Sequence, residues 1–263
     1  MMHIKKIQLP IAIFFGFLFS LHSKVFAQNT NKKVKETSVS KAATKANSVV
    51  ISYPASPGMV TSPDFTVKVN DKNIWTESVG NGGMENLNVA NFSGSGTQTI
   101  RVTASSTIKK YAILPKIRAI AAKVNGRELT FTISGPQKLY IEIDSLPRLA
   151  IFSNPLEVNP PRKEDASVVY YAPGTYTPNE INLHSNQTIY IAGGAVVNAN
   201  IRGKNLENIK ILGRGILNGN VRISGTSNLE VNGIFIRSTT GWTNTLTDCF
   251  HTIYNNVKVF SYL

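Results

Sequence analysis

Residues 48–147 contain short runs in which apolar and polar positions alternate. These runs are rich in β-branched and aromatic residues and cover positions 49–53, 65–69, 99–104, 110–114, 128–133 and 139–143. In the second run, Phe65, Val67 and Val69 would face one side of a strand, and the polar residues between them would face the other. Turn-forming stretches such as Gly80-Asn-Gly-Gly and Ser134-Gly-Pro separate the runs. Two-residue periodicity between frequent turns predicts an antiparallel β-sandwich over 48–147.

A different pattern begins after a proline-rich, charged connector at 148–180, whose last part holds a strand that starts at Val168 and ends at a Pro-Gly turn. From residue 181 onward, stretches that begin at Thr188, Asn208 and Asn228 align with a period of twenty residues. The alignment places three sets in step: Ile189, Ile209 and Leu229; Ile191, Ile211 and Val231; and Gly193, Gly213 and Gly233. A fourth copy places Tyr254 23 residues after Val231, which indicates a longer turn within 238–247.

A repeat of β-branched residues with this period is typical of a solenoid, in which each coil buries its apolar face only by stacking on the next. Leucine-rich repeats share the period, but this segment lacks their Leu-rich pattern and their helical stretches. We therefore predict an all-β chain, in which the sandwich is followed by the first coils of a right-handed parallel β-helix over 181–263. The glycines at 193, 213 and 233 are expected at tight corners between strands, where a positive φ is needed.

The first 27 residues carry the features of a secretory signal peptide. Lys5 and Lys6 precede an apolar run at 11–21 that is too short to span a bilayer, and Val25-Phe-Ala27 offers a cleavage site. Residues 28–47 form a polar, basic leader that we expect to be disordered. No later segment is apolar enough to predict a membrane helix. The sequence therefore predicts a secreted or periplasmic protein, cleaved after Ala27 and without a membrane partner.

The formal net charge of the chain is +13 at pH 7. A basic balance suits an acidic polysaccharide such as a polyuronate, and it equally suits a solvated surface without a ligand. The chain lacks the aromatic-interleaved basic motif of nucleic-acid-binding modules, so we expect no nucleic-acid partner. The single cysteine, Cys249, excludes an intramolecular disulfide framework and is expected to be a small buried side chain. We expect a monomer that needs no cofactor.

Four stretches resemble one known superfamily: Tyr170-Tyr-Ala-Pro-Gly-Thr-Tyr, Asn186-Gln-Thr-Ile-Tyr-Ile-Ala-Gly-Gly-Ala-Val-Val, Ile211-Leu-Gly-Arg-Gly-Ile-Leu-Asn-Gly and Gly241-Trp-Thr. They are similar to the pectin-lyase-like β-helix proteins, and in particular to glycoside hydrolases of the polygalacturonase (family 28) and dextranase–isopullulanase (family 49) groups. The preceding sandwich looks more like the dextranase group. In polygalacturonases, Asp usually stands where this chain has Asn218.

The resemblance implies a glycoside hydrolase that inverts the anomeric carbon, in which one carboxylic acid protonates the leaving oxygen and carboxylates activate water on the opposite face. In these families the carboxylates lie in an Asn-Thr-Asp motif and an Asp-Asp pair on consecutive coils. Neither motif occurs here, and the acids beyond residue 181 are Glu207, Glu230 and Asp248. We therefore expect the catalytic residues beyond Leu263, a chain that is a fragment, and no hydrolysis of polygalacturonate or dextran by this chain itself.

Three residues around the predicted long turn are candidates for binding a polysaccharide substrate. Trp242 would stack on a sugar ring, Arg237 would meet a carboxylate, and Asp248 would lie at the edge of a cleft. Packing within the turn is the alternative role for Trp242, and no metal ligands are predicted. Two other functions stay open on the same fold: a polysaccharide lyase that uses Ca²⁺ and a basic residue, and a non-enzymatic adhesin or carbohydrate-binding protein.

Overall fold

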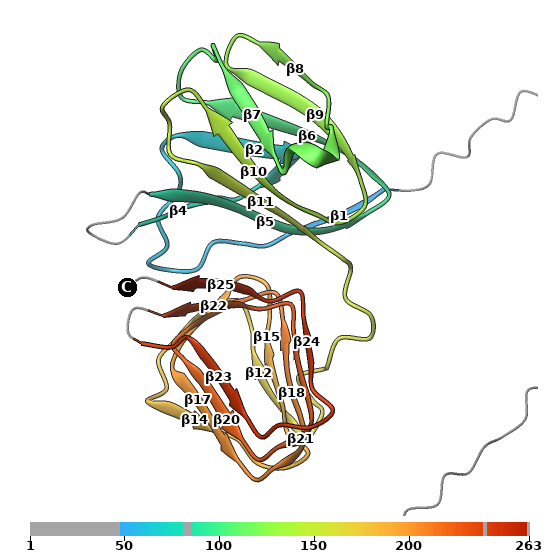
Figure 1. Cartoon of the computed structure of the whole chain (residues 1–263), viewed down its shortest axis with the longest axis vertical. Helices are drawn as coiled ribbons and strands as arrows, with labels where there is room; N and C mark the ends of the chain where they lie inside the picture. Colours follow the sequence, from blue (N-terminus) through green and yellow to red (C-terminus); the bar gives the residue numbers. More distant parts are fainter. Residues whose placement is uncertain (1–47, 81–85, 239–240, 262–263) are drawn as a thin grey trace, which may run out of the picture. The chain divides into compact units, whose positions relative to one another are not determined.

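The computed structural model describes residues 48–80, 86–238 and 241–261, so the predicted signal peptide and basic leader lie outside the described residues. The described chain is all-β, with antiparallel sheets followed by a parallel β-solenoid of about four turns (Figure 1). The predicted fold class is therefore confirmed. In this part of the chain, no helix is long and apolar enough to cross a membrane.

The sandwich consists of two sheets. The first has the order β1-β5-β11-β10-β7, with β4 also paired to β5. Its strands are β1 (Val49–Ser52), β4 (Thr76–Val79), β5 (Leu87–Ser95), β7 (Tyr111–Leu114), β10 (Gln137–Ile143) and β11 (Leu149–Asn154). The second has the order β3-β2-β6-β9-β8, with the strands β2 (Phe65–Val69), β3 (Lys72–Ile74), β6 (Thr97–Ala104), β8 (Ala122–Asn125) and β9 (Glu128–Ser134). A 3₁₀ helix, η1 (Lys116–Arg118), lies between β7 and β8.

The core of the sandwich forms where the apolar faces of its two sheets meet. Phe65, Val67 and Val69 of β2 are all buried, at 2% exposure or less, as their alternation predicts. They belong to one cluster with Leu139 and Ile141 of β10, which are fully buried in the other sheet. Because successive side chains of a strand point to opposite faces, the polar residues of β2 lie on the outer side.

The sandwich extends beyond the boundary predicted at residue 147. β11 pairs with β10 and runs parallel to β5, although the prediction assigned residues 149–154 to the connector. Every residue of β11 is buried. Leu149 and Ile151 of β11 belong to the sandwich core. Ala150 and Phe152 belong to a second cluster, which the sandwich shares with the solenoid. Alternation did not predict β5, because polar residues such as Asn88 occupy fully buried positions in it.

Three parallel sheets form the solenoid, and each complete coil contributes one strand to each sheet. The first sheet contains β12 (Val168–Tyr171), β15 (Thr188–Ile191), β18 (Glu207–Gly213), β21 (Ser227–Asn232) and β24 (Ile253–Asn255). The second contains β13 (Gly174–Tyr176), β16 (Ala195–Asn198), β19 (Ile216–Asn218), β22 (Phe235–Ser238) and β25 (Lys258–Ser261). The third contains β14 (Glu180–Asn182), β17 (Asn200–Lys204), β20 (Val221–Ser224) and β23 (Asn244–Thr247). Inward-facing aliphatic side chains of successive coils stack into one core.

The register of the solenoid differs from the predicted alignment at one step. Between β15 and β18, Ile189 lies opposite Ile211 and Ile191 lies opposite Gly213, an offset of 22 residues instead of 20. The step from β18 to β21 has the predicted offset of 20, and the step to β24 has the predicted 23. The prediction that Gly193 and Gly213 stand in step is therefore wrong. A shift of two residues keeps every inward side chain inward, so the apolar pattern does not distinguish the two registers.

The corner glycines also follow this corrected register. Gly213 and Gly233 have positive φ values of 125° and 88°, as predicted, whereas in the preceding coil the positive φ belongs to Gly194 instead of Gly193. A Cβ atom on Gly213 would lie 1.9 Å from the carbonyl oxygen of Ile191 in the coil below. The coils therefore approach so closely at this corner that only glycine fits.

An asparagine ladder holds another edge of the solenoid. Asn186, Asn208 and Asn228 lie on consecutive coils and all have positive φ, a conformation that Asn tolerates better than most residues. The side-chain amide of Asn208 donates to Asn186 Oδ1 at 2.8 Å, and that of Asn228 donates to Asn208 Oδ1 at 3.0 Å. These repeated bonds align the coils at the turn that leads into the first sheet.

The sandwich and the solenoid share buried apolar contacts. A separate cluster joins side chains of both: Val79, Val89, Ala150, Phe152 and Phe235. Within it, the rings of Phe152 and Phe235 meet edge to face at 5.3 Å between centroids. Such aromatic pairs add to the stabilisation from burial alone.

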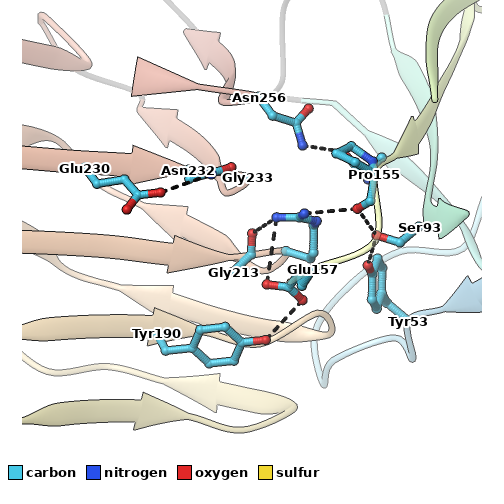
Figure 2. A network of polar contacts seen from close by, with 12 residues as sticks. Tyr53, Ser93, Pro155, Glu157, Tyr190, Gly213, Glu230, Asn232, Gly233 and Asn256 are labelled. Atoms are coloured by element: carbon cyan, nitrogen blue, oxygen red, sulfur yellow. Dashed lines mark hydrogen bonds and ion pairs between the residues drawn. The ribbon is translucent and has the colours of Figure 1, made fainter. Parts of the chain in front are cut away.

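Polar groups surround this junction, and part of their network is drawn in Figure 2. The hydroxyls of Tyr53 and Ser93 share a hydrogen bond of 2.5 Å, and Ser93 donates to the carbonyl oxygen of Pro155 at 3.2 Å. The hydroxyl of Tyr190 donates to the carboxylate of Glu157 at 3.1 Å. Burial is the main cause that raises the pKa of Tyr53 to about 12 and the pKa of Tyr190 well above its usual range. Both phenols therefore stay neutral at physiological pH.

Candidate functional site

A short motif recurs where the second sheet of the solenoid turns into the third. Asn198-Ala-Asn-Ile-Arg202 and Asn218-Gly-Asn-Val-Arg222 share the pattern Asn-x-Asn-x-Arg, and they stand twenty residues apart. Each begins at the last residue of a second-sheet strand, β16 or β19, and continues into β17 or β20. In the first copy, the buried Ala199 and Ile201 alternate with the two asparagines and the arginine, which therefore face outward.

The two copies stack directly on each other. Asn198 pairs with Asn218 in the register of β16 and β19, and Arg202 pairs with Arg222 in the register of β17 and β20. The amide of Asn218 donates to Asn198 Oδ1 at 2.8 Å, and the backbone amide of Asn220 donates to the side-chain oxygen of Asn200 at 2.9 Å. Rows of amides thus run along the axis of the solenoid.

A cleft of ≈ 730 Å³ lies over these rows, and we call it the amide cleft. The solenoid lines it with Asn198, Asn200, Asn218, Asn220 and Arg237, among others. The sandwich lines it from the loop that contains Met59 and Val60 and from the β4 residue Glu77. Both parts of the described chain therefore contribute to one concave surface, and ligand sites are usually concave.

Glu77 and Arg237 form a buried ion pair in the lining of the amide cleft. Glu77 Oε1 and Arg237 Nη1 are 2.9 Å apart, and Glu77 Oε2 and Arg237 Nη2 are 2.5 Å apart. Their side chains are only 8% and 12% exposed. The guanidinium carbon of Arg237 also lies 5.9 Å from the ring centroid of Phe260. The two-point geometry is that of a strong carboxylate–guanidinium pair, and its charges cancel, so the cleft is polar without net charge.

The structure places the three predicted binding residues differently. Arg237 lines the amide cleft, where the carboxylate it meets is that of Glu77. Trp242 is 77% exposed, and its carbonyl oxygen accepts a hydrogen bond of 3.2 Å from the side chain of Asn220, which brings it to the cleft edge. Asp248 is exposed and is not among the residues that line the cleft. Their roles in binding stay predictions.

A second, smaller groove of ≈ 390 Å³ runs over the outer face of the third sheet, and we call it the basic groove. Its charged residues are Arg202, Lys204 and Arg222. Arg202 Nε lies 3.3 Å from a carboxylate oxygen of Glu180. In the described part of the chain, neither Lys204 nor Arg222 has a carboxylate within ion-pair distance. The basic groove is therefore positively charged, unlike the amide cleft.

Acidic groups are sparse around both surfaces. Of the described residues that line the amide cleft, Glu77 alone carries a carboxylate, and it is held by Arg237. Glu230 and Asn232 both lie on β21 of the first sheet, where Glu230 accepts a hydrogen bond from Asn232 (Figure 2). Glu207, on β18 of the same sheet, is exposed. Among residues 48–80, 86–238 and 241–261, no three His, Cys, Asp or Glu side chains gather closely enough to hold a metal ion. The cleft can thus bind through amides and hydroxyls, and its described residues include no pair of free carboxylates for acid–base chemistry.

The Asn-x-Asn-x-Arg motif carries most of the site residues, and sequence reasoning missed it. The repeat of twenty residues is visible in the sequence, but the prediction used its aliphatic positions and not its polar ones. Burial in the core does not explain why polar residues recur on an outer face. The recurrence of the same polar residues at the same spacing in two repeats was therefore the sequence signal for a site. Glu77 carried no such signal, because its partner is 160 residues away in the sequence.

Comparison with known proteins supports the fold. No known protein-family pattern matches the sequence, and no curated protein is recognisably similar to it in sequence. Among solved structures, Dex49A from Penicillium minioluteum superposes with a TM-score of 0.62 at 16% sequence identity, covering 80% of this chain and 60% of that one. The chain therefore spans about 60% of the length of Dex49A. The likeness shows a shared β-helix fold.

Proposed function

We propose that this chain is a secreted polysaccharide-active protein of the glycoside hydrolase type, and that the amide cleft holds its glycan. The observation that carries the proposal is the pair of stacked asparagine rows under a cleft of ≈ 730 Å³. Side-chain amides offer both donors and acceptors, which match the many hydroxyls of a sugar chain. Trp242 is linked to the cleft residue Asn220 through its backbone carbonyl, and its exposed indole is an apolar surface on which a sugar ring can stack.

The direction of the rows favours a polymer over a small molecule. Successive coils of a parallel solenoid lie about 4.8 Å apart, so the rows present the same amides at regular steps along the axis. A glycan laid along that axis meets repeated contacts, one set per coil. The fold shared with Dex49A, a dextranase, supports a polysaccharide ligand, and the sequence resemblance leaves galacturonan and α-glucan as alternatives.

Hydrolysis is the further step of the proposal. Inverting glycosidases need two carboxyl groups about 6.5–9.5 Å apart. Among the described residues that line the amide cleft, Glu77 is the single carboxylate, and Arg237 holds it as an ion pair. For hydrolysis, carboxylates from outside the described residues would have to complete the site. The same observation favours a non-catalytic carbohydrate-binding protein as the second candidate function.

Equilibrium binding tests the proposal. Fluorescein-labelled dextran and polygalacturonate are titrated with the chain, and anisotropy is recorded. We expect binding of at least one polymer, and the double variant Asn198→Ala/Asn218→Ala should weaken it about tenfold, since two amide contacts of about 0.7 kcal/mol each are lost. Trp242→Ala should weaken it several-fold. Asn232→Ala, which removes an amide from the other side of the coil, is the matched control and should bind as the wild type does.

Two results would contradict the proposal. One is an absence of binding to both polymers, and the other is equal loss in the cleft variant and in Asn232→Ala. A reducing-sugar assay on the same samples separates the two candidate functions. We expect no release of reducing ends by this chain, and turnover would show that the chain itself contains a catalytic pair.

A further inference from the structure

The basic groove continues the surface of the amide cleft along the same strands. Arg202 and Arg222 follow Asn200 and Asn220 by two residues, which is the spacing of side chains on one face of a strand. The register places Arg202 opposite Arg222, so the two arginines occupy neighbouring rungs of the third sheet. A ligand that lies over the asparagine rows therefore has a column of guanidinium groups beside it.

Stacked like charges need an explanation. Two cations directly opposite each other on adjacent strands destabilise a sheet. Arg202 has a structural role, because its Nη1 donates to the carbonyl oxygens of Ile201 and Asn220 at 3.1 and 3.4 Å. In the described part of the chain, the side chain of Arg222 makes no such bond. Two other arginines of the solenoid are paired with acids: Arg237 with Glu77, and Arg214 with Glu157 at 3.8 Å. Arg202 has one carboxylate neighbour, Glu180, which leaves Arg222 and the nearby Lys204 without a counter-charge among the described residues.

The chemistry of these groups selects a class of ligand. The planar guanidinium binds carboxylate and sulfate oxygens with two parallel hydrogen bonds, and it is always charged. Arg222 is exposed, and it lines a groove whose uncharged polar residues are hydroxyls and amides such as Ser224, Thr245 and Asn182. The groove offers donors and positive charge with no competing free carboxylate, so an anionic group suits it better than a neutral sugar.

We propose that the basic groove binds the acidic groups of an anionic glycan, carboxylates or sulfate esters, while the amide cleft holds its sugar hydroxyls. This inference rests on the proposed function and deepens it, because it names the substrate class. Arg202 and Arg222 lie on consecutive coils, so they would meet acidic groups on neighbouring repeats of a chain that runs along the solenoid. The net charge of +13 supports the encounter with such a polyanion.

The test compares three polymers and two variants at about 150 mM salt, where long-range attraction is largely screened. The polymers are polygalacturonate, which carries carboxylates; dextran sulfate, which carries sulfate esters; and dextran, which is neutral. Arg222→Gln removes the charge in the groove. Lys210→Gln removes one charge from the outer face of the first sheet on the same coil and is the matched control.

We expect the wild type to bind a polyanion more tightly than dextran, and Arg222→Gln to weaken that binding about tenfold while Lys210→Gln leaves it unchanged. Arg222→Lys should recover only part of the loss, because an ammonium lacks the two-point geometry. The tighter of the two polyanions identifies the acidic group. Melting temperatures of all variants confirm that the fold is intact.

Other outcomes overturn the inference in distinguishable ways. If dextran binds as tightly as the polyanions and Arg222→Gln changes nothing, the inference fails while the proposed function stands. If both charge variants lose binding equally, the attraction is general and the groove is not a site. If none of the three polymers binds, the proposed function itself fails.

Discussion

The sandwich and the solenoid are both built from short β-strands, but they set strand register by different means. In the sandwich, two-residue turns join the paired strands β2 and β3 and the paired strands β8 and β9. The turn between β2 and β3 consists of Asn70 and Asp71, both with positive φ, which is the conformation of a two-residue hairpin turn. In the solenoid, paired strands are a whole coil apart, and contacts between coils at the corners set the register instead of turns.

This difference determines whether strand register can be predicted from the sequence pattern alone. A hairpin turn specifies its own register locally, because its length and residue types select one pairing. Between coils of the solenoid, a slip of two residues preserves the buried face, so the register depends on contacts such as the close approach of Gly213 to Ile191. Turns in the sandwich should therefore tolerate change better than the corners of the solenoid.

A matched pair of glycine substitutions gives the largest contrast between the two regions. Gly213→Ala places a Cβ 1.9 Å from a backbone oxygen at φ 125°, whereas at Gly126, in a sandwich turn with φ 59°, nothing lies within 4 Å of the new atom. We expect Gly213→Ala to lower the free energy of unfolding by about 4 kcal/mol or more and Gly126→Ala by about 1 kcal/mol. Urea denaturation measures both. Similar losses at the two sites would remove the distinction between corners and turns.

The ion pair at the junction tests whether the two regions stabilise each other. Glu77→Ala leaves the guanidinium of Arg237 buried without its partner, which should cost about 3 kcal/mol. The double variant Glu77→Leu/Arg237→Met removes both charges and should cost clearly less. Chemical denaturation of the three proteins is the measurement. A single variant no less stable than the double variant would mean that Arg237 finds another partner.

A smaller effect concerns the pH dependence at the same junction. The ammonium of Lys258 donates to Asn154 Oδ1 and the carbonyl oxygen of Gly233, both at 2.7 Å. Burial lowers the pKa of Lys258 to about 6, helped by the nearby charges of Arg214 and Lys138 and opposed by that of Glu157.

Because the unfolded chain then binds a proton that the folded chain lacks, stability should rise as the pH increases from about 6 toward 10. Between pH 6 and 8 the expected gain is about 2 kcal/mol relative to the variant Lys258→Met, which lacks this group. Denaturation curves of both proteins at the two pH values provide the difference. An equal pH response in wild type and variant would show that Lys258 keeps its proton.

Several parts of the structure could be predicted from local patterns alone. The alternation at Phe65, Val67 and Val69 marked a buried strand face, and the glycines at 213 and 233 marked corners with positive φ. The candidate site was less accessible. Trp242 and Arg237 were selected for their chemistry, but the asparagine rows were overlooked because amides on an outer face leave no trace in the apolar pattern.

The sequence by itself determined the two periodicities, two residues in the sandwich and about twenty in the solenoid, because each follows from which side chains must leave water. The tertiary structure decided the offset of 22 residues between β15 and β18, the burial of polar strands such as β5, and the pairing of Glu77 with Arg237. Those features depend on which surfaces meet once the elements have formed. A pattern of hydrophobicity records that a face is buried, and it does not record what lies against that face.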